Sequence, residues 1–140
     1  MKTLRLLSGG AAQGLVEALQ PAFETRTGRT IDGVFGAVGA MKARLLSGEP
    51  ADLLILSRAL IDELALVGHV VPLSVTDIGA VQTSVAIRDG DALPAVGSAE
   101  ELRAALRSAD EIHFPDPGLS TAGIHFANVL RDLGLWEQLA

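Results

Sequence analysis

Three short loops of small residues are the parts of this sequence best suited to binding chemistry. Each joins an expected strand to an expected helix, where the first backbone N–H groups lack partners and the helix dipole adds partial positive charge. Three such helix starts around one cleft would hold an oxyanion-sized ligand with few charged side chains. For any single loop, the alternative is that glycine and serine serve only as turn and cap residues. The predicted ligand contacts in these loops are Ser8, Gly9, Gly10, Ala11, Val38, Gly39, Thr121, Ala122 and Gly123.

Arg58 is the charged side chain predicted to join this site. It directly follows the aliphatic run 52–56, at the carboxyl end of an expected strand. A guanidinium there could pair an anion through two parallel hydrogen bonds. The alternative is a solvated residue in the first turn of a helix.

Catalytic machinery is not evident in the sequence. No nucleophile has an obvious base, and no carboxylate pair has a spacing that implies acid–base work. His69, His113 and His125 show no metal-ligand spacing, and His125 is the best functional candidate because it follows Thr121 closely. Asp52 and Asp116 are typical of residues that cap loops and form turns. We therefore predict a binding site without catalytic residues, metal or cofactor.

Composition and charge exclude several other classes of function. The chain has 140 residues, 11 Lys and Arg against 17 Asp and Glu, and a net charge of −6. With no basic stripe, nucleic acid is not an expected partner. The absence of cysteine excludes disulfides, thiolate catalysis and iron–sulfur clusters. No G-x-G-x-x-G or G-x-x-x-x-G-K-[ST] motif for nucleotides is present, and the apolar runs are too short to cross a membrane.

The first half of the chain alternates strands with helices. Apolar runs predict strands at 3–7, 30–35 and 52–56, and apolar periodicity predicts helices at 12–27, 40–47 and 58–67. Short connections between them favour a parallel sheet with flanking helices, an α/β fold. Pro21 should kink or split the first helix, because it removes one backbone donor.

The second half is predicted to be a smaller, incomplete lobe. Alternating residues predict a half-covered strand at 81–88, and a second short strand is expected at 111–114. Ser98 and Glu101 form a capping box that opens a helix to about Ser108. Further helices are expected at 122–133 and 135–139. The predicted lobes are residues 1–78 and 79–140, with little core in the second.

Several segments resemble one known family over nearly the whole chain. The chain resembles the molybdate-binding proteins of ABC importers, which are type II periplasmic solute-binding proteins. The resemblance implies a two-lobed α/β protein that closes around an oxyanion, with a transporter permease as partner. The segments that carry it are Leu6-Leu7-Ser8-Gly9-Gly10-Ala11, the loop after Phe35, Gly48-Glu49-Pro50-Ala51-Asp52-Leu53, Pro115-Asp116-Pro117 with Ala122-Gly123-Ile124, and Leu133-Gly134-Leu135-Trp136.

The resemblance also implies where a ligand would be held. Family members use serine hydroxyls and N–H groups at helix starts, and the two contacting serines fall on Ala11 and Val38 here. Both hydroxyls are therefore missing, while Ala122 matches a position that uses only its N–H group. A different anion, organic and paired with Arg58, is as consistent with the sequence as molybdate.

Three functions remain open from the sequence. The leading hypothesis is a binding protein for a small anion that feeds an ABC importer. The second is a cytoplasmic ligand-sensing module of the same fold. The third is a small phosphate-handling enzyme that uses His125 or Asp52. The sequence shows no identifiable acid–base pair for this third function.

Length and the chain start bear on assembly and compartment. Family members are longer, so the 140 residues are expected to be a piece of a longer chain or a short member of the family. If the chain were complete, exposed apolar edges would favour a homodimer or larger homo-oligomer. The resemblance implies the periplasm. A native start at Met1 would imply the cytoplasm, since Ser8-Gly9-Gly10 interrupts the first apolar stretch too early for a signal peptide.

Overall fold

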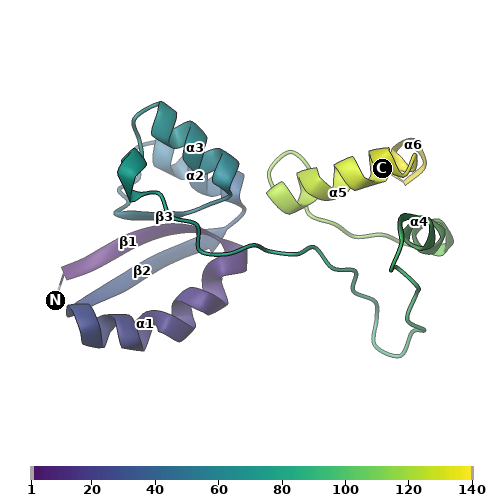
Figure 1. Ribbon diagram of the computed structural model, residues 1–140, viewed down its shortest axis with the longest axis horizontal. Helices are drawn as coiled ribbons and strands as arrows, with labels where there is room; N and C mark the ends of the chain where they lie inside the picture. Colours follow the sequence, from purple (N-terminus) through teal and green to yellow (C-terminus); the bar gives the residue numbers. More distant parts are fainter. Residues whose placement is uncertain (1, 140) are drawn as a thin grey trace. The chain divides into compact units, whose positions relative to one another are not determined.

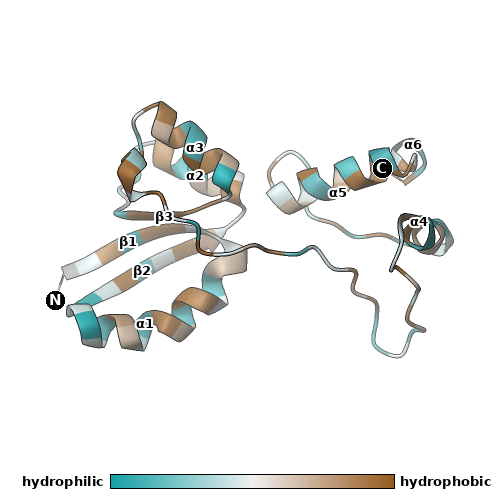
Figure 2. Cartoon of the chain, in the orientation of Figure 1, coloured by the Kyte–Doolittle hydropathy of each residue, from teal (hydrophilic) through white to brown (hydrophobic). Residues whose placement is uncertain are grey.

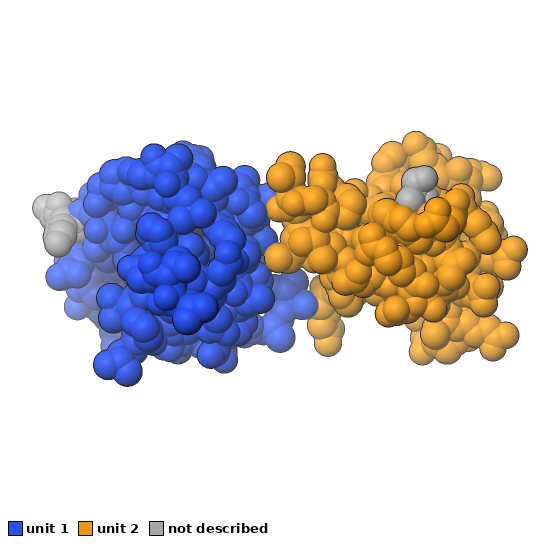
Figure 3. Space-filling model, turned by 90° about the horizontal axis from the view of Figure 1, so that it is seen from above, with its two compact units in different colours: residues 1–81 blue, residues 82–140 orange. Residues whose placement is uncertain are grey.

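The chain divides into two compact units, residues 1–81 and 82–140 (Figure 3). The computed structural model describes residues 2–139. The first unit holds all the paired strands among these residues, and the second holds three helices. The expectation that two lobes close around a ligand stays a prediction.

Unit 1 is built on a parallel sheet of three strands. Strands β1 (Lys2–Gly9), β2 (Arg29–Gly36) and β3 (Leu53–Ile55) lie in the order β2-β1-β3 (Figure 1). All pairings are parallel, which confirms the predicted fold class and the strands expected at 3–7, 30–35 and 52–56. In the central strand, Leu6 and Leu7 are each only 2% exposed, as a strand covered on both faces requires. Figure 2 shows hydrophobic residues along β1 and β3 where the two strands pair.

Helices flank this sheet, as predicted. The 3₁₀ turn η1 (Gly10–Ala12) and helix α1 (Gln13–Thr27) follow β1, and α2 (Val38–Leu46) follows β2 (Figure 1). Because β2 and β3 lie on opposite sides of β1, right-handed crossovers place α1 and α2 on opposite faces of the sheet. Helix α3 (Arg58–Leu66) follows β3 and leads to the 3₁₀ turn η2 (Pro72–Ser74). An ion pair of 2.6 Å between Lys42 Nζ and Glu63 Oε1 holds α2 beside α3.

Of the kink or split expected at Pro21, the split is wrong, while a kink stays a prediction. Helix α1 continues unbroken through Pro21 to Thr27. Proline removes the hydrogen bond to the Glu17 carbonyl, but both residues are exposed and water can satisfy that oxygen. The helix ends where Gly28 takes a left-handed conformation with φ of 64°.

Unit 2 packs its helices around a small leucine core. Its helices are α4 (Ala99–Ser108), α5 (Thr121–Asp132) and α6 (Trp136–Leu139), close to the predicted bounds. The Ser98 Oγ accepts a hydrogen bond of 3.2 Å from the Glu101 N–H, so the predicted N-cap of α4 is confirmed. The buried core consists of Leu106, Leu130 and Leu135.

The strands predicted at 81–88 and 111–114 are not formed. Both segments lack a paired strand among the described residues. Strand-forming sequence yields a strand only when a partner supplies the ladder and a packing surface. Ile112 and Phe114 still pack against the leucine core of unit 2, while Glu111 and His113 between them are exposed. Residues 111–114 thus alternate between exposed and packed side chains, as a strand does, but do not form the hydrogen bonds of a strand.

Candidate functional site

The carboxyl edge of the unit 1 sheet brings three helix starts together. We use "carboxyl edge" for the loops 9–12, 36–39 and 56–58, which follow β1, β2 and β3. The register places Gly9 opposite Gly36 and Ser8 opposite Ile55, so the three strands end side by side. Parallel strands bring their following loops to one edge, which is where ligands bind in open α/β sheets.

Gly9 marks the point where these loops approach one another most closely. A Cβ atom at Gly9 would lie 2.8 Å from Val38 Cγ1 and 3.7 Å from the Ile55 carbonyl oxygen. The start of α2 packs against the end of β1, so a larger residue at position 9 would require the Val38 side chain to shift. At Gly10, by contrast, a Cβ would lie 3.8 Å from the Gly36 oxygen, which is ordinary contact. A side chain at Gly10 would therefore fit the fold.

None of the three helices at the carboxyl edge begins with a side-chain cap. The N-cap residues Gly9 of η1, Ala37 of α2 and Ser57 of α3 make no capping hydrogen bond. In unit 2, Ser98 and Ser120 cap α4 and α5 with their side chains. The first N–H groups at the carboxyl edge are thus left for water or for a bound anion, in the field of three helix dipoles.

Two serines lie at this edge and differ in what their hydroxyls do. Ser8 is fully buried, and its Oγ donates to the Gly9 carbonyl oxygen at 3.0 Å, so its hydroxyl is engaged with the backbone. Ser57 Oγ is buried and has no hydrogen-bond partner among the described residues. A buried, unpaired hydroxyl lowers the stability of the fold. Its presence indicates a role in binding rather than in stability. Sequence reasoning missed Ser57, although a serine directly after the run 52–56 was a signal.

The free hydroxyl of Ser57 leads to a test with two opposite effects. We expect Ser57→Ala to leave the stability of the free protein unchanged or raise it by up to about 1 kcal/mol, because an unsatisfied group is removed. The residue is only partly buried, so rotation about its χ1 torsion can turn the hydroxyl to a ligand. If this edge binds an anion, as the sequence predicts, its affinity should then weaken about tenfold. Thermal unfolding and calorimetric titration check the two effects. Lower stability with unchanged affinity would contradict this role.

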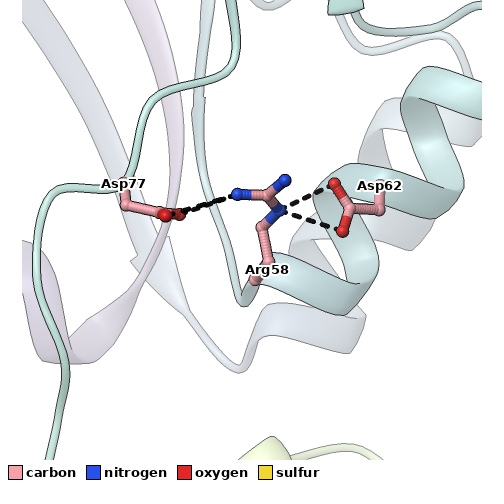
Figure 4. Close-up of polar contacts among 3 residues, drawn as sticks. All are labelled: Arg58, Asp62 and Asp77. Atoms are coloured by element: carbon pink, nitrogen blue, oxygen red, sulfur yellow. Dashed lines mark hydrogen bonds and ion pairs between the residues drawn. The ribbon is translucent and has the colours of Figure 1, made fainter.

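The guanidinium of Arg58 is paired with two carboxylates (Figure 4). Its Nε lies 2.8 Å from Asp62 Oδ1, one helical turn along α3, and its Nη1 lies 3.2 Å from Asp77 Oδ1. The hydrogen bond to Asp62 raises the pKa of Arg58 most, and the hydrogen bond to Asp77 raises it further. The guanidinium therefore keeps its positive charge. The side chain is 61% exposed. An anion at the carboxyl edge would have to compete with Asp62 and Asp77 for this cation.

The third predicted loop belongs to unit 2. The strand expected before it is not formed, so the prediction that Thr121, Ala122 and Gly123 follow a strand at a sheet edge is wrong. Ser120 Oγ accepts from the Gly123 N–H at 3.5 Å, which caps α5. That these residues join Ser8, Gly10, Ala11 and Gly39 in one ligand site stays a prediction.

The remaining candidate residues have structural roles or lie exposed on the surface, where His113 Nε2 is 3.2 Å from Glu111 Oε1. The Asp52 carboxylate accepts the Arg5 N–H at 2.9 Å and its Nε at 3.1 Å, which fastens β3 to β1. Asp116 Oδ1 accepts the Gly118 N–H at 2.6 Å, so the predicted turn is confirmed. His69, His113 and His125 are exposed. The described residues hold no group of His, Cys, Asp or Glu arranged for a metal ion.

Comparison with known proteins identifies the class. The bacterial extracellular solute-binding protein family matches residues 4–140, so the chain belongs to this family. The expected class of solute-binding protein is thereby confirmed, and specificity for molybdate remains a prediction. Among the described residues, no helix combines the length and apolar character needed to cross a membrane.

One characterised relative gives a further point of comparison. The chain is similar to an aconitate isomerase of Pseudomonas sp, with 28% identity over 133 residues. The similarity covers 91% of this chain and 50% of the relative, so the chain spans about half the length of that protein.

Proposed function

We propose that this chain is a solute-binding component that holds a small carboxylate anion at the carboxyl edge of unit 1. The observation that carries the proposal is the set of uncapped helix starts of η1, α2 and α3 beside one another at the end of a parallel sheet. Their N–H groups would bind the carboxylate oxygens, and the helix dipoles would stabilise its charge.

A carboxylate suits this edge better than molybdate. Ala11 and Val38 stand where the resemblance to molybdate-binding proteins places serine hydroxyls. The donors that remain are backbone N–H groups, the hydroxyl of Ser57 and the guanidinium of Arg58. A planar carboxylate matches the fork of a guanidinium. The similarity to a protein named for aconitate, a tricarboxylate, supports the same choice.

Isothermal titration calorimetry tests the proposal directly. The parent chain would be titrated with cis-aconitate, trans-aconitate, citrate, molybdate and sulfate under one buffer condition. We expect saturable binding of at least one tricarboxylate and weaker binding of the inorganic anions. Tighter binding of molybdate than of every carboxylate would overturn the choice of ligand class.

Asp77→Asn provides a test of the role of Arg58. Removing this carboxylate frees one side of the guanidinium for a ligand, so we expect affinity for the tricarboxylate to rise about two- to fivefold, as for an exposed ion pair. Glu63→Gln removes a carboxylate that pairs with Lys42 instead and should leave affinity unchanged. Calorimetry of both variants checks the effect, and equal affinities in parent and Asp77→Asn would argue against ligand binding by Arg58.

The name of the relative favours isomerisation of such a ligand as a second candidate. Moving a carbon–carbon double bond requires a base that takes a proton from one carbon, and the return of a proton to another carbon of the ligand. Asp77, 3.2 Å from the Arg58 guanidinium, is the carboxylate that we would assign to that step. The same variant separates the two functions: Asp77→Asn should abolish conversion of cis- to trans-aconitate by an isomerase and improve affinity in a binding protein. Chromatography of the two isomers after incubation with the parent chain decides between them.

The family supports a proposal for the protein partner and the compartment. As an extracellular solute-binding protein, the chain would deliver its ligand in the periplasm to the permease of an ABC importer. Cross-linking of the liganded protein to the membrane fraction of the source bacterium, followed by mass spectrometry, would identify the permease.

A further inference from the structure

One ion pair holds residues 76–81, the last of unit 1, to the sheet and helices before them. All six residues are exposed. The last backbone hydrogen bond before them runs from the Val75 N–H to the Pro72 carbonyl oxygen, at 3.2 Å. Both oxygens of Asp77 accept from Arg58 Nη1, at 3.2 and 3.3 Å (Figure 4). Within the described chain, residues 76–81 make no other hydrogen bond to unit 1.

Arg58 holds its two carboxylates unequally. Its Nε donates to both oxygens of Asp62 at 2.8 and 2.9 Å, and Asp62 lies one turn further along the same helix. The contacts to Asp77 are longer, and its side chain is 74% exposed against 54% for Asp62. Solvent screens such an exposed pair, and an irregular segment gains conformational entropy when it is released. Asp77 is therefore the carboxylate that a competing anion displaces.

The guanidinium has a free side on which a ligand can first attach. Within the described residues Arg58 donates through Nε and Nη1, and its Nη2 makes no hydrogen bond. Arg58 is also the first residue of α3, at the carboxyl edge. A ligand carboxylate at Nη2 would be the third negative group around one cation. Repulsion between like charges then acts on the most loosely held of the three, which is Asp77.

We propose that the Arg58–Asp77 pair is a latch that the ligand opens. A carboxylate bound at the carboxyl edge takes the place of Asp77 on Arg58 and frees residues 76–81, which continue into unit 2. The inference rests on the proposed function, because it needs an anion at the same guanidinium. An exposed ion pair favours the closed latch only about two- to fivefold, so a ligand that binds the open state better shifts the population readily.

Nitrogen-15 relaxation of the 140-residue chain tests the latch. Heteronuclear NOE values at the amides of Ile78 and Gly79 report the fast motion of the segment. We expect these values to fall when trans-aconitate saturates the parent chain. In Asp77→Asn they should be low without ligand and should not fall further with it. Circular dichroism verifies that each variant is folded.

Two further variants make the test specific to this pair. Arg58→Gln removes the other half of the latch, so the segment in the double variant with Asp77→Asn should be no more mobile than in either single variant. Asp91→Asn makes the same change of charge in the same irregular stretch. The Asp91 carboxylate has no partner within the described chain, so this control should behave like the parent.

The outcomes separate the latch from the binding of the ligand. Equal NOE values in free Asp77→Asn and the free parent would show that the pair holds nothing, and would overturn the latch. The latch is also overturned, and the proposed function kept, if trans-aconitate shifts the amides of Ala11, Val38 and Arg58 while residues 76–81 stay as ordered as before. If the ligand shifts none of these three amides, the proposed function and the latch both fail.

Discussion

Replacing Gly123 by alanine is expected to destabilise unit 2 by about 3 kcal/mol, through overpacking against rigid backbone. The added Cβ would lie 2.2 Å from the Pro115 carbonyl oxygen and 2.5 Å from that of Asp116. Both oxygens belong to the backbone of the 115–118 turn, so no side chain can rotate away. Either α5 or the turn must move, and the cap from Ser120 is lost with it.

Gly14→Ala is the matched control for this change. It is the same substitution in the first turn of α1, where an added Cβ meets nothing within 4 Å. Alanine should stabilise that helix by about 0.5–1 kcal/mol. Urea denaturation of the two variants measures both effects. Equal stability of Gly123→Ala and the parent chain would show that α5 does not pack on the 115–118 turn as described.

Gly10→Val is expected to abolish binding of the carboxylate while the fold survives. A Cβ at Gly10 meets only the Gly36 oxygen at 3.8 Å, so the fold accommodates it. The branched side chain then occupies the space that a ligand needs to reach the N–H groups of the carboxyl edge. Calorimetry should show at least a hundredfold loss of affinity, about 2.8 kcal/mol.

Two controls make this result specific to the carboxyl edge. Gly14→Val adds the same side chain one turn further along, at an exposed position, and should bind like the parent. Thermal unfolding verifies that Gly10→Val remains folded. If Gly10→Val binds as tightly as the parent chain, the ligand lies elsewhere and the small-residue loops are only loops.

The fold of unit 1 could be predicted because its signals are local. The short apolar-rich segments that became β1, β2 and β3 are bounded by glycine or polar residues, and helices are expected between them. The strand expected at 81–88 shows the limit of such reasoning. Its alternation predicts strand propensity, but the described residues supply no partner, and propensity without a ladder leaves the chain extended and unpaired.

The candidate site was predictable at its glycines and less so at its side chains. Gly9, Gly10 and Gly39 follow strands that the sequence placed well, so the register brings their loops together. Arg58 pairs with Asp77, 19 residues along the chain, because the chain returns toward α3 after η2. Residue spacing in the sequence does not predict this pair. The sequence position of Ser57, just before a helix, would predict a capping hydrogen bond. Its hydroxyl is unpaired because of the local packing, which the sequence does not show.

Amide chemical shifts test the central claim most directly, since they report which N–H groups meet the ligand. A ¹⁵N-labelled sample of the parent chain would be titrated with trans-aconitate and followed by two-dimensional NMR. The account predicts saturable shifts at the amides of Ala11, Val38 and Arg58, with one shared dissociation constant, and little change at the capped start of α4. Shifts confined to other residues, or none at the carboxyl edge at saturating ligand, would contradict it.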